Sequence, residues 1–317
     1  MSMHFRDIAV QAASDGAIGP EEILALRRAG WVDGRMDPEE AEALFVANDH
    51  IAEPSAEWCD FFVEALGEFI VNTVEPKGYV DQVMADELVS RIDRDGRVET
   101  MAELELLVRV LERSQSVPGS LRTYALRQIE DAVLHGEGAT RRGELDPKGI
   151  NETECTLLRR LIFSAGGDRP AAVSKAEAEM LFRIKDATLY ELNAPDWDKL
   201  FVQGVANYLL GFGGHEPLTR DRAAELEQFL AAEGAGISGF LGRMAMAEPD
   251  FKGAFGSLLD MGPQGLDTEG AAAEAAAFTE QEDLWLLDRI DADEELDPLE
   301  KALLAFIAEE TGDAPAL

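Results

Sequence analysis

The chain contains few of the residues from which disulfide frameworks and histidine metal sites are built. It has two cysteines and four histidines in 317 residues. Two cysteines do not suggest a disulfide framework, and thiols stay reduced in the cytoplasm. No two histidines lie at the spacing that places two metal ligands on one helix face. We therefore expect a reducing, cytoplasmic location and no histidine-based metal centre.

Long apolar segments and strand patterns are also missing. No run of 18 apolar residues occurs, which predicts that nothing spans a membrane. The N-terminal segment lacks the basic region and apolar core of a secretory signal, since it reads MSMHFRDIAV. No alternating run of β-branched residues reaches six positions between turn signals. The sequence therefore predicts an all-α protein with no significant β-sheet.

Basic residues are scarce, which gives the chain an unusually large negative net charge. There are 28 Lys and Arg against 63 Asp and Glu, giving a net charge of −35. A surface with this charge cannot neutralise phosphates or bind anionic lipid, so we predict neither a nucleic-acid nor a membrane partner. Cations, a basic protein partner or simple solubility are all compatible with it. The apolar content of 46 % is sufficient for a packed core.

The usual signatures of catalysis are absent. The sequence has no phosphate-binding P-loop and no GxSxG nucleophile elbow. A literal GxGxxG occurs at 234–239, but it follows a helical pattern rather than a strand, so it predicts a turn between helices. No pair of carboxylates stands out as an acid and base couple. We therefore predict a protein that is not an enzyme and requires no cofactor.

What the sequence does contain is a short recurring phrase. An apolar residue is followed by a polar residue that can cap a helix, often with Glu three positions later, and a helical pattern then begins. The apolar residues of the phrase occur in pairs whose internal spacing is 18, 18, 23, 19 and 18 residues. Such regularity indicates tandem repeats. The pairs are Ile18 and Met36, Val80 and Val98, Ile150 and Val173, Leu218 and Ile237, and Phe278 and Leu296.

Each repeat is predicted to hold three helices. The third helix follows a proline, which is tolerated in a first turn. In the first repeat an apolar stripe begins at Trp58, and 139 residues later it begins again at Trp197. The prolines are Pro54, Pro118, Pro195 and Pro249.

These repeats predict a duplicated helical array. We expect a first block of two units at 1–134, a linker at 135–149 and a second block, duplicated from the first, at 150–261. A linker rich in Gly and Ala follows at 262–277, and a truncated fifth unit occupies 278–317.

Two of the loops before a repeated phrase are similar to EF-hand calcium loops. Ca²⁺ prefers six to eight oxygen ligands, supplied from alternate loop positions and a final bidentate Glu. A divalent cation such as Ca²⁺ is therefore one hypothesis for these loops. The candidate ligands are Asp93, Asp95 and Glu99 in the first loop and Asp291, Asp293, Asp297 and Glu300 in the second.

Helix capping is the competing interpretation of the same phrase. Position 1 of the two loops would be Arg91 and Arg289, and a cation cannot replace the first carboxylate. Ala102 stands where the first loop needs its bidentate Glu. Asp, Asn, Ser or Thr at a helix start, with Glu three residues on, forms a capping box without metal. Capping leaves the additional acids at Asp93, Asp291 and Asp293 unexplained, so both interpretations stay open.

The Asp-Gly turns, capping acids and short helices together resemble the TerB-like domains of tellurite resistance. In that family Asp-Gly-x-apolar-x-x-x-Glu recurs between helices, and the resemblance extends loosely over the four complete units. It implies a helical stress-response or interaction module, with acidic residues near the turns that hold metal.

The function predicted from the sequence is non-enzymatic. We expect a protein-interaction module whose acidic surface attracts a basic partner and whose apolar surface supplies affinity. The truncated unit at 278–317 is predicted to form a partner or homo-oligomer contact. The alternative is a sensor or binder of divalent cations that uses the two EF-hand-like loops.

Overall fold

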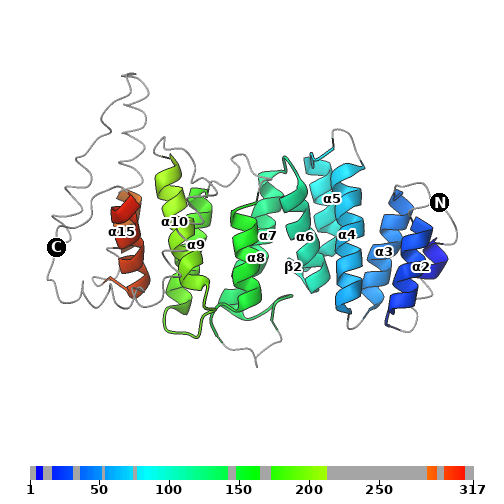
Figure 1. Ribbon diagram of the computed structural model, residues 1–317, viewed down its shortest axis with the longest axis horizontal. Coiled ribbons are helices and arrows are strands. Elements are labelled where there is room, and N and C mark those ends of the chain that lie inside the picture. Colours follow the sequence, from blue (N-terminus) through cyan, green and yellow to red (C-terminus); the bar gives the residue numbers. More distant parts are fainter. Residues whose placement is uncertain are drawn as a thin grey trace, which may run out of the picture. The chain divides into compact units, whose positions relative to one another are not determined.

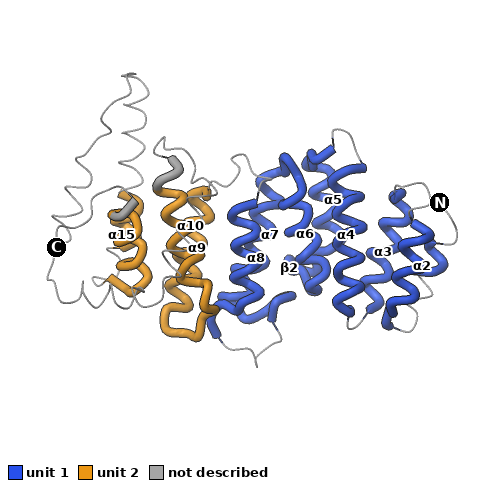
Figure 2. The backbone as a smooth tube through the Cα atoms, in the orientation of Figure 1, with its two compact units in different colours: residues 1–171 blue, residues 172–317 orange. Residues whose placement is uncertain are grey.

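The computed structural model describes most of the N-terminal two thirds of the chain and part of its C-terminal region. Its described residues form helices and one short hairpin, which confirms the predicted all-α class. They divide into two compact units, residues 1–171 and 172–317 (Figure 2). The described ranges are 5–9, 16–30, 36–51, 54–73, 77–141, 148–164, 173–212, 284–290 and 296–310.

In the first unit, α4 and α6 form the most extensive helix pair, and the other helices pack around them (Figure 1). Helix α4 packs against α2, α3 and α6, and α6 in turn packs against α7 and α8. The elements are α2 (Pro20–Gly30), α3 (Pro38–His50), α4 (Ala56–Asn72), α5 (Gln82–Ile92), β1 (Asp93–Arg94), β2 (Arg97–Val98), α6 (Met101–Arg113), α7 (Gly119–His135) and α8 (Glu152–Ile162).

The second unit is built around one central helix. Helix α10 (Trp197–Phe212) contacts both α9 (Lys175–Thr188) and α15 (Pro298–Glu310). Residues 284–290 are also helical. The division between the units falls at 171, whereas the predicted second block begins at 150, so α8 packs with the first unit. The block boundaries rest on internal sequence similarity and, like the three-helix units, stay predictions.

Helix starts lie where the recurring phrase predicts them. Asp37 Oδ1 accepts the backbone N–H of Glu40 at 2.9 Å, and the Glu40 carboxylate accepts the N–H of Asp37 at 3.1 Å. Asn151 and Ser174 form the same reciprocal capping box with the glutamate three residues on. The paired bonds satisfy backbone donors that a first turn leaves unpartnered. Pro54 and Pro195 likewise precede the starts of α4 and α10, and Pro118 is itself the cap of α7.

The apolar residues of the phrase form part of the core. Six of those that the structure describes are buried, and Leu296 is half-buried. Leu218, Ile237 and Phe278, together with the glycine motif at 234–239 and Pro249, lie outside the described residues. The six buried residues are Ile18, Met36, Val80, Val98, Ile150 and Val173.

The same aromatic cluster occurs once in each unit. Phe45 and Phe62 meet edge to face at 5.6 Å in the first unit, and Phe182 and Phe201 do so at 5.2 Å in the second. Each cluster includes a fully buried tryptophan, Trp58 or Trp197, whose ring lies 6.1 or 6.2 Å from the second phenylalanine. Edge-to-face rings add about 0.5–1.5 kcal/mol to the energy of burial. The repeated geometry supports the predicted duplication of these two helices.

One position in this duplicated cluster differs between the copies. Asn48, three residues after Phe45, accepts the indole N–H of Trp58 at 3.0 Å. Lys185 occupies the corresponding place, three residues after Phe182, and the indole nitrogen of Trp197 has no hydrogen-bond partner in the part of the chain that the structure describes. The position therefore holds the tryptophan in one copy and is available for another contact in the other copy.

The Asn48→Ala variant should lose about 1–3 kcal/mol of unfolding free energy, because it leaves the buried indole N–H of Trp58 without an acceptor. Urea denaturation measures this loss. The neighbouring Asp49→Ala variant is the control, since it removes only an exposed ion pair with Arg94 and should cost less than about 1 kcal/mol. Equal losses in the two variants would contradict the assigned role of Asn48.

Candidate functional site

The first predicted metal loop is a tight β-hairpin between α5 and α6. Asp95 and Gly96 form its two-residue turn, with φ of 55° and 88°. Two successive positive φ angles are typical of a type I′ turn, which Asp-Gly favours because glycine adopts them without steric cost. Val98 pairs with Asp93 across the hairpin, and its backbone N–H donates to Gln128 Oε1 at 2.8 Å. Helix α7 therefore holds the hairpin in place.

Both carboxylate oxygens of Asp93 accept hydrogen bonds from protein groups. Oδ1 accepts the backbone N–H of Gly96 at 2.7 Å, and Oδ2 accepts the hydroxyl of Tyr124 at 2.9 Å. The additional acid that capping left unexplained thus has a structural role, because it ties the turn to itself and to α7. This role was not apparent from the sequence, since Tyr124 lies 31 residues further on.

The other two predicted ligands of this loop make no such contacts among the described residues. Asp95 and Glu99 are both exposed. Basic residues of the loop are paired instead with acids of other elements: Arg94 contacts Asp49 of α3 at 2.9 Å, and Arg97 contacts Glu137. No three side chains of Asp, Glu, His or Cys among the described residues lie close enough together to hold a metal ion.

The second predicted loop falls partly outside the described residues, at Asp291 and Asp293. Its other two candidate ligands, Asp297 and Glu300, start α15 as a capping box. Asp297 Oδ1 accepts the N–H of Glu300 at 2.9 Å, and Glu300 Oε2 accepts the N–H of Asp297 at 2.9 Å. Each carboxylate keeps its second oxygen for a different contact.

Those second oxygens converge on the ammonium group of Lys185 in α9. Lys185 Nζ donates to Glu300 Oε1 at 2.7 Å and to Asp297 Oδ2, and it also pairs with Asp186 at 2.8 Å. The side chains of Lys185 and Glu300 are only 1 % and 5 % exposed. The structure thus brings together the two predicted metal ligands that it describes in this loop, and a lysine supplies the positive charge between them.

The charges of this cluster depend on one another. Burial alone would lower the pKa of Lys185, but its hydrogen bonds to three carboxylates outweigh burial and raise that pKa. Burial raises the pKa of Glu300, while its bonds to Lys185 and to the Asp297 backbone lower it. The ammonium form of Lys185 is therefore favoured at neutral pH, and its contribution to stability is lost only as pH rises above the ordinary lysine value.

A similar arrangement begins helix α8 in the first unit. Glu154, the glutamate of the Asn151 capping box, is fully buried and contacts the guanidinium of Arg141 at 2.6 Å. Arg141 also donates to the carbonyl of Gly149 at 2.7 Å, and Thr140 donates to the second oxygen of Glu154 at 2.7 Å. Burial raises the pKa of Glu154, and the bonds from its donors oppose this rise. Sequence inspection missed both Arg141 and Lys185.

Comparison of the chain with protein-family models, curated protein sequences and solved structures finds no match. Among the residues that the structure describes, no helix is both long and apolar enough to cross a membrane.

Replacing Lys185 by Met should destabilise the second unit by about 3–5 kcal/mol, because the buried Glu300 and the half-buried Asp297 would lose their cation. Urea denaturation and amide exchange of α15 measure the effect. Lys199→Met is the matched control: its ion pair with Asp196 is more exposed, and its loss should cost less than about 1 kcal/mol.

A compensated variant separates lost charge balance from lost packing. Adding Asp297→Asn and Glu300→Gln to Lys185→Met should recover part of the stability, since the buried charges then disappear together. Failure of this triple variant to exceed the single variant would indicate that packing of the lysine stem, not charge, holds α15.

The pKa of the Tyr124 phenol depends on its hydrogen bond to Asp93. Burial, and then its hydrogen bond to Asp93, raise the pKa of Tyr124 above its ordinary value of 10.0. The folded state therefore holds this proton more tightly than the unfolded state, and stability falls as pH rises above that value. Asp93→Asn should lower the tyrosine pKa, as measured by phenolate absorbance. Tyr124→Phe should lose less stability at alkaline pH than the unmodified chain.

Proposed function

We propose that this chain is a non-enzymatic, acidic helical protein that acts as a protein-interaction module and binds a basic partner. The observation that carries the proposal is that many basic residues form ion pairs with acids of the same chain, which leaves the excess acids unpaired. Two of the buried acids have internal cations, Glu154 with Arg141 and Glu300 with Lys185. The chain has 63 acidic and 28 basic residues, so each internal pairing leaves the acid excess to the surface.

Many of the remaining arginines of the first unit are also held by acids of the same unit. Arg160 of α8 is the clearest case, since its guanidinium bridges Glu105 at 2.7 Å and Glu112 at 2.8 Å, both on α6. Such arginines stabilise contacts between helices and contribute little positive potential outside. The other pairs are Arg27 with Glu64, Arg91 with Glu42, Arg94 with Asp49 and Arg97 with Glu137.

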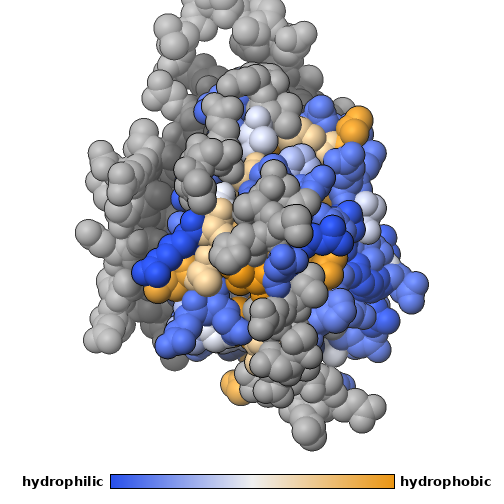
Figure 3. Space-filling view, turned by 90° about the vertical axis from the view of Figure 1, so that its right-hand side faces the viewer, coloured by the Kyte–Doolittle hydropathy of each residue, from blue (hydrophilic) through white to orange (hydrophobic). Residues whose placement is uncertain are grey.

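The described surface combines hydrophilic and apolar residues. Figure 3 shows the face at the α2 end, where hydrophilic residues predominate and hydrophobic ones appear in patches between them. A negative potential raises the rate at which a positive partner arrives, and apolar contacts then lower its dissociation rate. A surface that both attracts a positive partner and offers it apolar contacts suits an interaction module. A reducing, cytoplasmic location is part of the same proposal.

Binding of a divalent cation is the second candidate function. The exposed carboxylates of Asp95 and Glu99, in the same loop as Asp93, favour it. At Asp297 and Glu300 a divalent cation would first have to displace the ammonium of Lys185. Cation binding also agrees with the resemblance to TerB-like domains, which implies a metal-associated stress role.

Calorimetric titration with Ca²⁺, with Mg²⁺ as the control, tests this candidate. At the first loop, Ca²⁺ bound by Asp93 would compete with Tyr124 and lower the tyrosine pKa.

Self-association through residues 278–317 is a further form of the interaction proposal. In the described part of this segment, Leu299, Leu303, Phe306 and Ile307 are buried, and α15 packs on α10. Light scattering of the full chain over a range of concentrations measures its oligomeric state.

A peptide of lysine and leucine should bind the full chain, and its affinity should fall as salt rises. Between about 0.01 M and about 0.15 M ionic strength the Debye length shortens from about 30 Å to about 8 Å, which screens the acidic surface. Fluorescence anisotropy of the labelled peptide measures binding. A matched peptide of glutamate and leucine is the control and should not bind. Equal binding of both peptides, or binding indifferent to salt, would contradict an electrostatic interaction module.

A further inference from the structure

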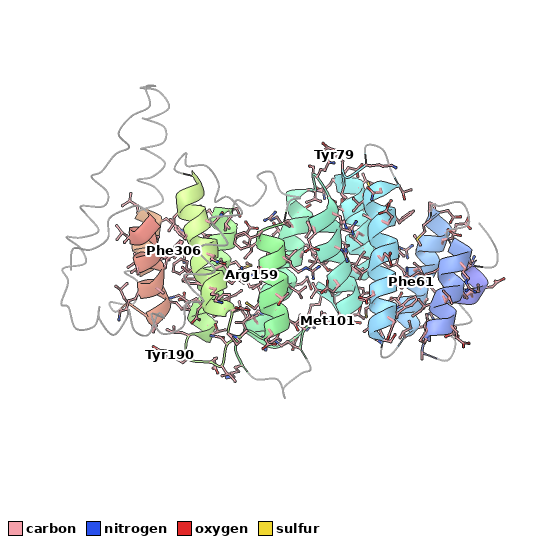
Figure 4. All side chains as sticks on the ribbon, in the orientation of Figure 1. Phe61, Tyr79, Met101, Arg159, Tyr190 and Phe306 are labelled. Carbon is pink, nitrogen blue, oxygen red and sulfur yellow. The ribbon has the colours of Figure 1, made fainter. Side chains whose placement is uncertain are left out.

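The connection between α9 and α10, residues 189–196, exposes two large apolar side chains. Tyr190 is 94 % exposed and Leu192 is 81 % exposed. Figure 4 shows Tyr190 on this connection, at the end of the helix pair rather than between the helices. Single exposed apolar residues are common, but here two large apolar side chains in one short connection are almost fully exposed to solvent. We call this segment the Tyr190 loop.

The Tyr190 loop is held in one conformation at both ends. The carbonyl of Thr188 accepts the backbone N–H of Glu191 at 3.0 Å and the side-chain amide of Asn193 at 2.8 Å. The backbone N–H of Trp197 donates to Ala194 at 3.0 Å, and the Trp197 ring is fully buried. The exposed pair is therefore presented by a fixed backbone. A partner that binds it does not have to order the loop first, which lowers the entropic cost of binding.

The helices themselves do not require these residues. The corresponding connection of the first unit, 51–55, joins α3 to α4, which carry the same aromatic cluster. Its one large apolar residue, Ile51, is buried. The connection between α6 and α7 likewise buries its large apolar residue, Val117. Since neither connection exposes a large apolar side chain, Tyr190 and Leu192 are not explained by the demands of joining two helices.

The charged residues within the connection that carries the exposed pair are acidic, and the nearest lysines, Lys185 and Lys199, lie in the flanking helices, where they pair with Asp186 and Asp196. From 186 to 198 the sequence contains acidic residues and no Lys or Arg. Glu191, Asp196 and Asp198 are exposed, and Asp196 has a surface ion pair with Lys199 at 3.4 Å. A leucine and a tyrosine in a connection whose charged residues are acidic complement a partner segment that carries apolar side chains between lysines or arginines. Tyrosine is frequent among the residues that dominate binding energy at interfaces.

We propose that the Tyr190 loop is the docking element of this chain, and that its occupant is a basic protein segment with apolar side chains that cover Tyr190 and Leu192. This inference rests on the proposed interaction function and specifies where the partner binds. The carboxylates of the loop attract the segment, and the two apolar side chains hold it. Both roles use surface that is exposed in the free chain.

The test uses the full chain and the labelled peptide of lysine and leucine. Tyr190→Ser combined with Leu192→Ser should weaken binding by at least about tenfold, since truncating each residue that dominates an interface weakens binding severalfold. Val83→Ser is the matched control, because Val83 is an apolar residue that is 65 % exposed on α5. The Val83→Ser variant should bind the peptide with the affinity of the unmodified chain. Circular dichroism should show unchanged helix content and melting temperature in both variants.

Each outcome has a distinct meaning. Salt-sensitive binding that falls only in the loop variant supports the Tyr190 loop as the docking element. Binding that is salt-sensitive but equal in the loop variant and the Val83 control overturns this inference and leaves the proposed function intact. If the peptide does not bind the unmodified chain at all, the proposed function fails, and the docking element fails with it.

Discussion

A buried glutamate in the first turn of a helix is the constraint on which much of this structure depends. Glu40, Glu103, Glu154, Glu177 and Glu300 all occupy the third position of a helix, and all are buried. Each reaches back to the backbone of its cap and so satisfies a donor that the helix leaves free. A buried carboxylate is costly without compensation, and capping alone compensates it only in part. At Glu154 and Glu300 the chain adds a cation from elsewhere, Arg141 or Lys185.

That added cation links segments that are distant in the sequence. Lys185 lies 115 residues from Glu300, and its ammonium fixes the start of α15 against α9. The position also shows how a duplicated scaffold diverges. In the first copy Asn48 accepts a hydrogen bond from Trp58. In the second copy Lys185 stands at this place; the indole nitrogen of Trp197 has no described partner, and the lysine pairs with α15 instead. One substitution thus converts a contact within a helix pair into a contact between that pair and a third helix.

The sequence was sufficient for the local features of the fold and insufficient for the distant ones. Helix starts such as Asp37 and Ser174 were predictable because capping depends on residues within four positions. The buried positions of Trp58 and Trp197 followed from the repeated apolar stripe. Asp93 and Glu300 were ambiguous because a carboxylate that binds metal and one that binds Tyr124 or Lys185 have the same local sequence. Only tertiary contacts, 31 and 115 residues away, distinguish them.

Internal cations also bear on how the surplus acidity should be interpreted. Calcium in an EF-hand loop balances carboxylates that would otherwise repel one another, and removing the metal loosens the loop. Asp297 and Glu300 are balanced by Lys185, and Glu154 by Arg141, so these helix starts carry their own positive charge. Their acids therefore serve the fold. The exposed carboxylate of Glu191, next to Tyr190, has no such contact among the described residues, and its charge is available to recognise a partner.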